Sequence, residues 1–220
     1  ADKNVYERDE KLLRELAENG SVTLIESAET GKIVGATISY LLAKEAGAPS
    51  YDWLEIGTTR IVLNGYPGLF DVMIAMQTLR AYLVEPPDSR FVCQMDTTPV
   101  QQMAGKLGFR PFTPDPAMLA AKEKTFKQDI TCNANNWYSA GPEALPVLAQ
   151  KMLETIDKPS LVNVKNGDTI KLDFSKSKFF SLFEEEFRDL AKRDLGNPDT
   201  PDYSNSVAQS RQKWMRWYFK

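Results

Sequence analysis

The chain of 220 residues contains no histidine. This absence excludes Ser-His and Cys-His nucleophile pairs and removes the commonest transition-metal ligand. Only two cysteines occur, Cys93 and Cys132, far apart and outside any CxxC spacing, so the sequence predicts neither a disulfide framework nor a zinc site. A catalytic base in this chain must therefore be a carboxylate, a tyrosine, a lysine or water, and we expect no metal.

The chain also lacks long apolar runs and an excess of basic residues. No run approaches the roughly 20 apolar residues of a membrane helix, and no apolar signal segment opens the sequence. The net charge of -3 and the pI near 5.2 argue against a nucleic-acid partner. Because the cysteine pattern also favours a reducing compartment, we expect a cytoplasmic protein without a membrane span.

Hydrophobic periodicity predicts alternating helices and strands in the first half of the chain. An amphipathic helix over 5–18 ends at Asn19-Gly20, and two β-rich runs, 21–28 and 32–42, flank a hairpin turn at Glu29-Thr30-Gly31. The next elements are a strand over 53–63, a turn containing glycines over 64–68, a helix over 67–84, a strand over 90–95, a helix over 98–106 with a capping box at 98–101, and a strand over 109–112.

The second half carries fewer motifs. The predicted elements are helices over 117–128, 143–156 and 178–193, a hairpin over 161–174 that turns at Asn166-Gly167, a proline-containing linker over 197–205 and a terminal helix over 206–219.

Two local strings and their place in this order of elements carry a family resemblance. Thr30–Leu42 reads TGKIVGATISYLL, and Lys106–Phe112 reads KLGFRPF. The order of the predicted elements, together with the two strings, resembles the GNAT superfamily of N-acyltransferases. This order is hairpin, long strand, turn, helix, strand and helix, followed by the second string. The resemblance implies an α/β (α+β) fold, in which helices flank a mixed, mainly antiparallel sheet.

The same resemblance implies a division of the chain into three parts. These are an N-terminal helix over 1–20, an acyltransferase core over 21–112 and a non-standard C-terminal extension over 113–220 that packs on the core. The first strand of the family is not evident before residue 21, so it is absent, replaced by the strand at 169–174, or located within residues 1–5.

The implied function is transfer of an acyl group from the pantetheine thioester of acyl-CoA or acyl carrier protein to the amine of a small molecule or amino acid. Free backbone N–H groups at the start of the helix after strand 53–63 would bind the pyrophosphate, because the helix dipole favours an anion there. The implied cofactor-binding residues are Leu63, Asn64, Gly65, Tyr66, Gly68, Leu69, Phe70 and Thr98. Glycines that only turn the chain are the alternative.

The turn departs from the usual family pattern. Asn64 or Gly65 stands where the family has its first Arg or Gln, and Phe70 replaces the last small residue. The strand Trp53–Leu63, which reads WLEIGTTRIVL, is similar to that of autoinducer synthases and long-chain N-acyl amino acid synthases. Those relatives carry a degenerate phosphate loop and can use acyl carrier protein.

Attack of an amine on a thioester needs a base and a donor for the developing oxyanion. We predict Glu55 as the base, acting directly or through water, with a merely paired strand carboxylate as the alternative. The predicted oxyanion donor is a backbone N–H near Val62 or Leu63. Arg60 lies on the opposite face of the strand unless a bulge intervenes, and is predicted to bind a substrate carboxylate or to be a structural partner.

Two further features leave alternatives open. Many GNAT enzymes protonate the leaving thiolate with a tyrosine at the position of Ala104, so the second functional hypothesis is a non-catalytic acyl-CoA-sensing or protein-interaction module. Aromatic residues of the helix over 178–193 and of the terminal helix are expected to be core. Their alternative role is to line a channel for a long acyl chain or to dock a partner.

Overall fold

The structure is a computed structural model that describes residues 9–42, 53–84, 90–95, 97–126 and 136–192. It is a mixed α+β fold, as the sequence predicts: helices flank a six-stranded, mainly antiparallel sheet. The predicted linker over 197–205, the terminal helix over 206–219 and Cys132 lie outside the described residues.

The sheet has the strand order β1-β2-β3-β4-β6-β5. Strands β1 (Val22–Glu26), β2 (Ile33–Leu41) and β3 (Trp53–Ile61) are antiparallel neighbours, and β4 (Arg90–Gln94) joins β3 in parallel. Strand β6 (Trp137–Ala140), which the sequence pattern does not predict, lies antiparallel between β4 and β5 (Arg110–Pro111). A strand from the second half of the chain therefore completes the sheet begun by the first half.

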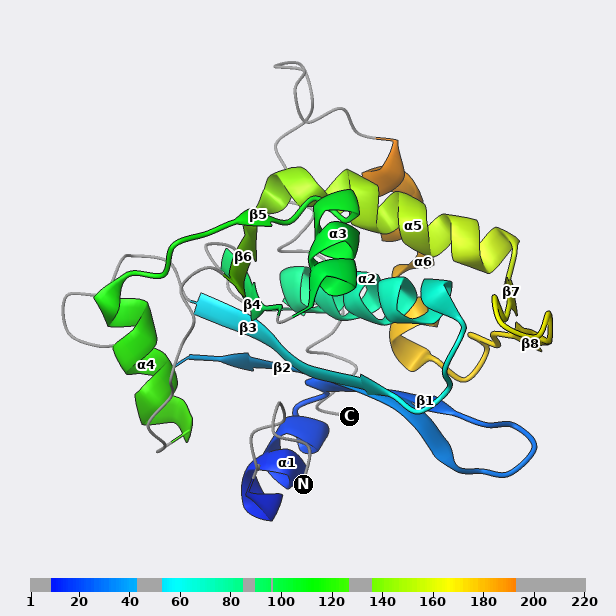
Figure 1. Cartoon of the computed structure of the whole chain (residues 1–220), viewed down its shortest axis with the longest axis horizontal. Helices are drawn as coiled ribbons and strands as arrows, with labels where there is room; N and C mark the ends of the chain where they lie inside the picture. The colour runs from blue at the N-terminus through cyan, green and yellow to red at the C-terminus, as the bar shows by residue number, and fades with distance from the viewer. Residues whose placement is uncertain (1–8, 43–52, 85–89, 96, 127–135, 193–220) are drawn as a thin grey trace.

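Helices cover both faces of the sheet (Figure 1). On one face, α2 (Pro67–Val84), α3 (Thr98–Lys106), α5 (Leu145–Asp157) and α6 (Lys178–Ala191) form the main core with Leu54, Ile56 and Phe91. On the other face, α1 (Glu10–Glu18) and α4 (Pro116–Phe126) pack around Tyr40, Val92 and Trp137. The sheet thus separates two apolar clusters.

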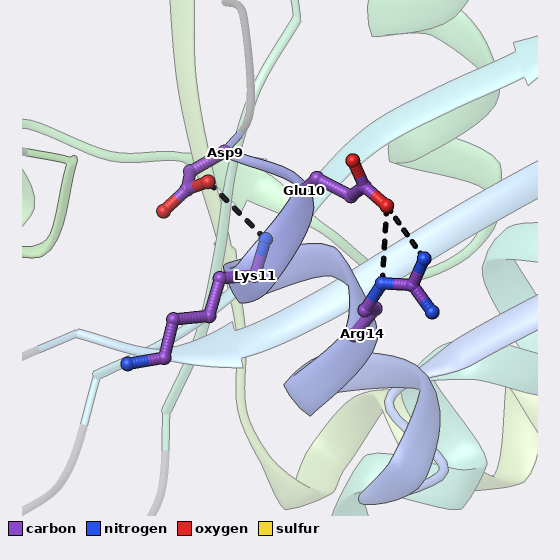
Figure 2. A network of polar contacts seen from close by, with 4 residues as sticks. All are labelled: Asp9, Glu10, Lys11 and Arg14. Carbon is purple, nitrogen blue, oxygen red and sulfur yellow. Dashed lines mark hydrogen bonds and ion pairs between the residues drawn. The ribbon is translucent and has the colours of Figure 1, made fainter.

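Helix α1 shows how local polar contacts fix a helix start (Figure 2). The carboxylate of Asp9, the N-cap residue, accepts a hydrogen bond from the backbone N–H of Lys11 at 3.2 Å. One turn along the helix, Arg14 Nη2 lies 2.6 Å from Glu10 Oε1. The bond to Asp9 satisfies one of the N–H groups at the helix start that have no partner within the helix. The ion pair joins two side chains that lie one turn apart on the same face of the helix.

Helix α2 is buried around most of its circumference, because it lies between the sheet and α5. It nevertheless carries three buried polar residues, of which Gln77 and Arg80 bond to the sheet and to the end of α1. Gln77 Nε2 donates to the Ser21 carbonyl at 3.2 Å, and Arg80 Nη2 donates to the Asn19 carbonyl at 3.0 Å. These bonds anchor α1 to the main core, since a buried polar group is stable only with its partners in place.

Two local predictions are corrected by the structure. The N-cap of α3 is Thr97, whose side chain makes no capping bond, and Gln101 donates instead to the Met95 carbonyl at 2.9 Å. The prediction of a capping box at 98–101 is therefore wrong. Such a box would make Thr98 the N-cap, whereas the helix begins one residue earlier, with Thr98 as its first helical residue. The hairpin that turns at Asn166-Gly167 is confirmed as β7 (Ser160–Val162) and β8 (Thr169–Lys171), but it forms a separate two-stranded sheet and does not replace the first family strand.

The phenylalanines of α6 belong to the main core, as predicted. Phe183 and Phe187 are completely buried, and the Phe179 and Phe183 ring centroids lie 4.7 Å apart. Helix α6 packs chiefly on α5, which packs in turn on α2. Its aromatic stripe therefore fills the interior and gives no support to an acyl-chain channel.

Phe183→Ala should lower the free energy of unfolding by about 3–5 kcal/mol, because truncation of a buried aromatic side chain loses contacts and leaves a cavity. Chemical denaturation measures the change. Leu182→Ala, at a partly buried position of the same helix, is the matched control and should cost less. Equal losses in the two variants would contradict the placement of α6 in the core.

Candidate functional site

The parallel strands β3 and β4 pair over three positions only and then diverge. The register pairs Trp53, Leu54 and Glu55 of β3 with Arg90, Phe91 and Val92 of β4. Beyond this point β3 continues to Ile61 beside β2, while β4 continues beside β6. Within the described residues, the edge of β3 that faces β4 from Ile56 to Ile61 has no strand partner, which leaves backbone N–H and C=O groups for another ligand.

A β-bulge lies in β3 just past this divergence point. Gly57 pairs with Ile38 and Arg60 with Ala36, so β3 holds one residue more than β2 between these pairs. A bulge increases the local twist, which turns the end of β3 away from β4. Without the bulge, strand alternation would place Arg60 and Glu55 on opposite faces of the sheet. The extra residue places them on the same face. The Arg60 side chain is exposed there.

Glu55 stands at the divergence point, and its carboxylate is buried on the sheet face covered by α4. Its Oε1 lies 2.9 Å from Lys122 Nζ, and the two side chains are 5% and 1% exposed. Removal of a carboxylate and an ammonium from water is costly, and the pairing of the two charges at hydrogen-bond distance offsets part of that cost. Glu55 is therefore a paired strand carboxylate, as the alternative hypothesis states, at a place where the sheet opens.

Lys122 is held by a set of groups that the sequence analysis does not identify. Its Nζ lies 3.4 Å from Gln94 Oε1 and 4.5 Å from the centroid of the Trp137 ring. Lys122 follows the buried Met118 by four residues, so it lies on the same side of α4. A lysine at a core position of a helix is the sequence signal that could have identified this residue.

Two buried polar atoms of this cluster have no hydrogen-bond partner among the described residues: Glu55 Oε2 and Trp137 Nε1. Each such atom costs about 1–3 kcal/mol, because it has lost its bonds to water without replacement. Natural proteins retain this cost at few places, often where a ligand or reaction needs the group. We therefore take Glu55, Lys122, Gln94 and Trp137 as the candidate site and call them the Glu55 cluster.

Cys93 lies next to this cluster but does not supply a nucleophile. Burial raises the pKa of its thiol well above the ordinary value, the negative charge of Glu55 raises it further, and the positive charge of Lys122 acts in the opposite sense. The side chain belongs to the main core on the other face of the sheet. The neutral, buried thiol is a small core residue, in agreement with its sequence context.

The turn predicted to bind pyrophosphate leads directly into α2, which begins at Pro67. Gly65 has φ +90°, a conformation that favours glycine. The β7–β8 hairpin packs on this turn: Asn163 Nδ2 donates to the Asn64 carbonyl at 3.0 Å, and Val164 N donates to the Gly65 carbonyl at 2.9 Å.

The hairpin also lies close to both glycines, Gly65 before the helix and Gly68 in the first turn of α2. A Cβ on Gly65 would lie 2.4 Å from Asn163 Oδ1, and one on Gly68 would lie 3.0 Å from Leu161 Cδ2. The contacts with Asn163 and Val164 occupy backbone carbonyls of the turn and none of its N–H groups. The glycines therefore have a packing role, and any anion at the start of α2 would lie beside the hairpin.

Charged residues near the start of α2 are mixed. Burial raises the pKa of Asp71, and the nearby Lys151 and Lys106 act in the opposite sense. Asp71 Oδ2 and Lys151 Nζ are 3.6 Å apart. Lys151 and Lys106 are thus the basic residues that act on the one acidic side chain in the first turns of α2.

The other predicted residues do not all gather around Glu55. Val62 and Leu63 follow Glu55 by seven and eight residues. A strand rises about 3.3 Å per residue, so roughly 20–25 Å separate Glu55 from them. One thioester carbonyl cannot contact both ends of β3. The N–H of Val62 is moreover bonded to the Val34 carbonyl at 2.9 Å.

The remaining predicted positions lie at the ends of helices or in the core. Thr98 is the first residue of α3 and is exposed, and Ala104 is fully buried in the main core. Leu69 is fully buried and Phe70 partly buried, so only their backbone is available to a cofactor.

Comparison with known proteins leaves the family open: no protein-family profile matches the chain, and no curated protein is significantly similar to it. Within the described ranges, no helix is both long enough and apolar enough to span a membrane. The same ranges contain no group of three or more cysteine and acidic side chains arranged to hold a metal ion.

Proposed function

We propose that this chain is an N-acyltransferase that moves an acyl group from the pantetheine thioester of acyl-CoA or acyl carrier protein to the amine of a small molecule or amino acid. The observation that carries the proposal is the position of Glu55. A buried carboxylate, one oxygen of which has no hydrogen-bond partner among the described residues, stands where the parallel strands of the sheet diverge. A cytoplasmic location, where such thioesters are made, is part of the proposal.

The unpaired edge of β3 supports a pantetheine donor. Pantetheine contains two amide groups, and an extended amide chain can pair with a free strand edge through backbone hydrogen bonds. Bound beside Ile56–Ile61, the arm would run towards the start of α2 at one end and towards Glu55 at the other. This arrangement places the oxyanion donor on β3 just after Glu55, rather than at Val62 or Leu63.

In the proposed reaction the acceptor amine attacks the thioester carbonyl carbon. The C–N bond forms, the C–S bond breaks, and the thiolate leaves with the electron pair and takes up a proton from solvent. Glu55 Oε2 receives the proton of the amine, directly or through water. Lys122 supports this role by position, because its Nζ lies 2.9 Å from Glu55 Oε1 and holds that oxygen, which leaves Oε2 to receive the proton.

The second candidate function is a non-catalytic acyl-CoA-sensing or protein-interaction module. Two observations favour it: Ala104 is buried core where many GNAT enzymes have a tyrosine, and the β7–β8 hairpin packs on the turn expected to bind pyrophosphate. A pantetheine thiol is acidic enough to leave without a dedicated acid, so the buried Ala104 permits turnover.

Thiol release from acyl thioesters by the purified chain tests the proposal. Acyl-CoA and acyl carrier protein donors from C2 to C14 are each combined with a panel of primary amines and amino acids. We expect release that depends on both the amine and the protein. Binding of a thioester without amine-dependent release would favour the sensing module and contradict the enzyme.

A further inference from the structure

The two partnerless atoms of the Glu55 cluster have complementary needs. Glu55 Oε2, as part of a carboxylate, accepts hydrogen bonds, whereas Trp137 Nε1–H only donates one. Both residues border the same ammonium: Lys122 Nζ lies 2.9 Å from Glu55 Oε1 and 4.5 Å from the Trp137 ring centroid. Glu55 on β3 and Trp137 on β6 therefore both border the polar region around the Lys122 ammonium, on the α4 face of the sheet.

The strand pairing explains why these residues face the same way. Glu55 pairs with Val92, and Trp137 pairs with Gln94 two residues further along β4. Paired residues share a face, and residues two apart on a strand share a face, so Glu55, Gln94 and Trp137 all point towards α4. Lys122 reaches this row from α4.

The occupant of this region must both donate and accept. Lys122 carries donors only, and an acyl chain carries neither kind of group. Water has both, and it is the smallest group that suits a site in which Glu55, Lys122 and Trp137 are almost completely buried. Glu55 Oε2 and Trp137 Nε1, with the Lys122 ammonium beside them, offer the two to four polar partners that an ordered internal water requires.

We propose that ordered water links Glu55 Oε2 to Trp137 Nε1 and transfers the proton of the acceptor amine to Glu55, with Trp137 as the positioning residue. This inference rests on the proposed function. As the C–N bond forms, the amine gives its proton to the water, and the water gives one of its own to Glu55 Oε2. Trp137 Nε1–H donates to the water oxygen throughout and is not consumed.

Trp137→Phe tests the role, because phenylalanine retains most of the ring packing and removes the N–H. We expect kcat for amide formation to fall about 10- to 100-fold while KM changes less than about twofold, since general-base transfer contributes about 10²–10⁴ and the variant impairs it only in part. Tyr138→Phe is the matched control: it removes a polar group from the next residue of β6, which points to the other face, and should leave kcat unchanged.

An NMR measurement tests the water without activity. Trp137→Phe identifies the Trp137 indole resonance among those of the four tryptophans, and this resonance should show cross-relaxation with long-lived water in the wild-type protein. Absence of that signal, or its loss when an acceptor amine occupies the site, would overturn the relay. An unchanged kcat in Trp137→Phe would overturn the water-mediated transfer alone, whereas absence of any turnover by the wild-type chain would overturn it together with the proposed function.

Discussion

Glu55→Gln should lower the rate of amine-dependent thioester consumption by about two to four orders of magnitude, the usual contribution of a general base. Glutamine has the shape of glutamate, but its amide does not accept the proton of the attacking amine. The measurement is thiol release at saturating donor and acceptor, expressed per folded protein, because the substitution also removes half of a buried ion pair.

The matched control is Glu26→Gln, which changes an exposed glutamate of β1 in the same sheet. It should leave the rate unchanged. If folded Glu55→Gln released thiol at the wild-type rate, Glu55 would not be the base. Its role would then be the buried ion pair with Lys122 alone.

Lys122→Met should lower the free energy of unfolding by about 3–5 kcal/mol at pH 7, because it leaves the Glu55 carboxylate buried without its counter-charge. The double variant Glu55→Gln/Lys122→Met should recover much of this loss, since neither charge then remains buried. Chemical denaturation of the two single variants and the double variant measures the coupling between the residues.

Lys124→Met is the matched control, because Lys124 is an exposed residue of the same helix. It should change stability by less than about 0.5 kcal/mol, as expected for surface substitutions. A double variant no more stable than Lys122→Met would show that the ion pair does not couple the two residues. We expect the double variant to recover stability but not activity, because Glu55 is both paired with Lys122 and catalytic.

Most of the secondary structure could be predicted because local signals agree with the tertiary context. Helix α2 occupies 67–84 as predicted, since Pro67 suits the first helical position and apolar residues recur throughout the segment. The two hairpins also form where Gly31 and Gly167, both with positive φ, permit the turn. Strand β6 was missed because four residues are too few to establish a period, and its pairing partners β4 and β5 precede it in the chain.

The candidate site could be predicted only in part. Glu55 is conspicuous as a carboxylate within an apolar strand, but its partners Lys122 and Trp137 come from elements far away in the sequence. These residues come into contact because α4 packs on the sheet and β6 pairs with β4. Both are tertiary arrangements, which local sequence patterns do not predict. The bulge that brings Arg60 to the face of Glu55 begins beside Gly57, and a glycine inside a strand is the local signal that could have indicated it.

The central claim is that Glu55 promotes transfer of an acyl group to an amine, and detection of the amide product tests it most directly. The wild-type chain and Glu55→Gln are incubated with an acyl thioester and an amine panel, and mass spectrometry records the products. We predict an N-acyl amine that accumulates in proportion to released thiol with the wild-type chain, and about 10²–10⁴ times more slowly with the variant. Thiol release without amide, or equal amide formation by both proteins, would contradict the account.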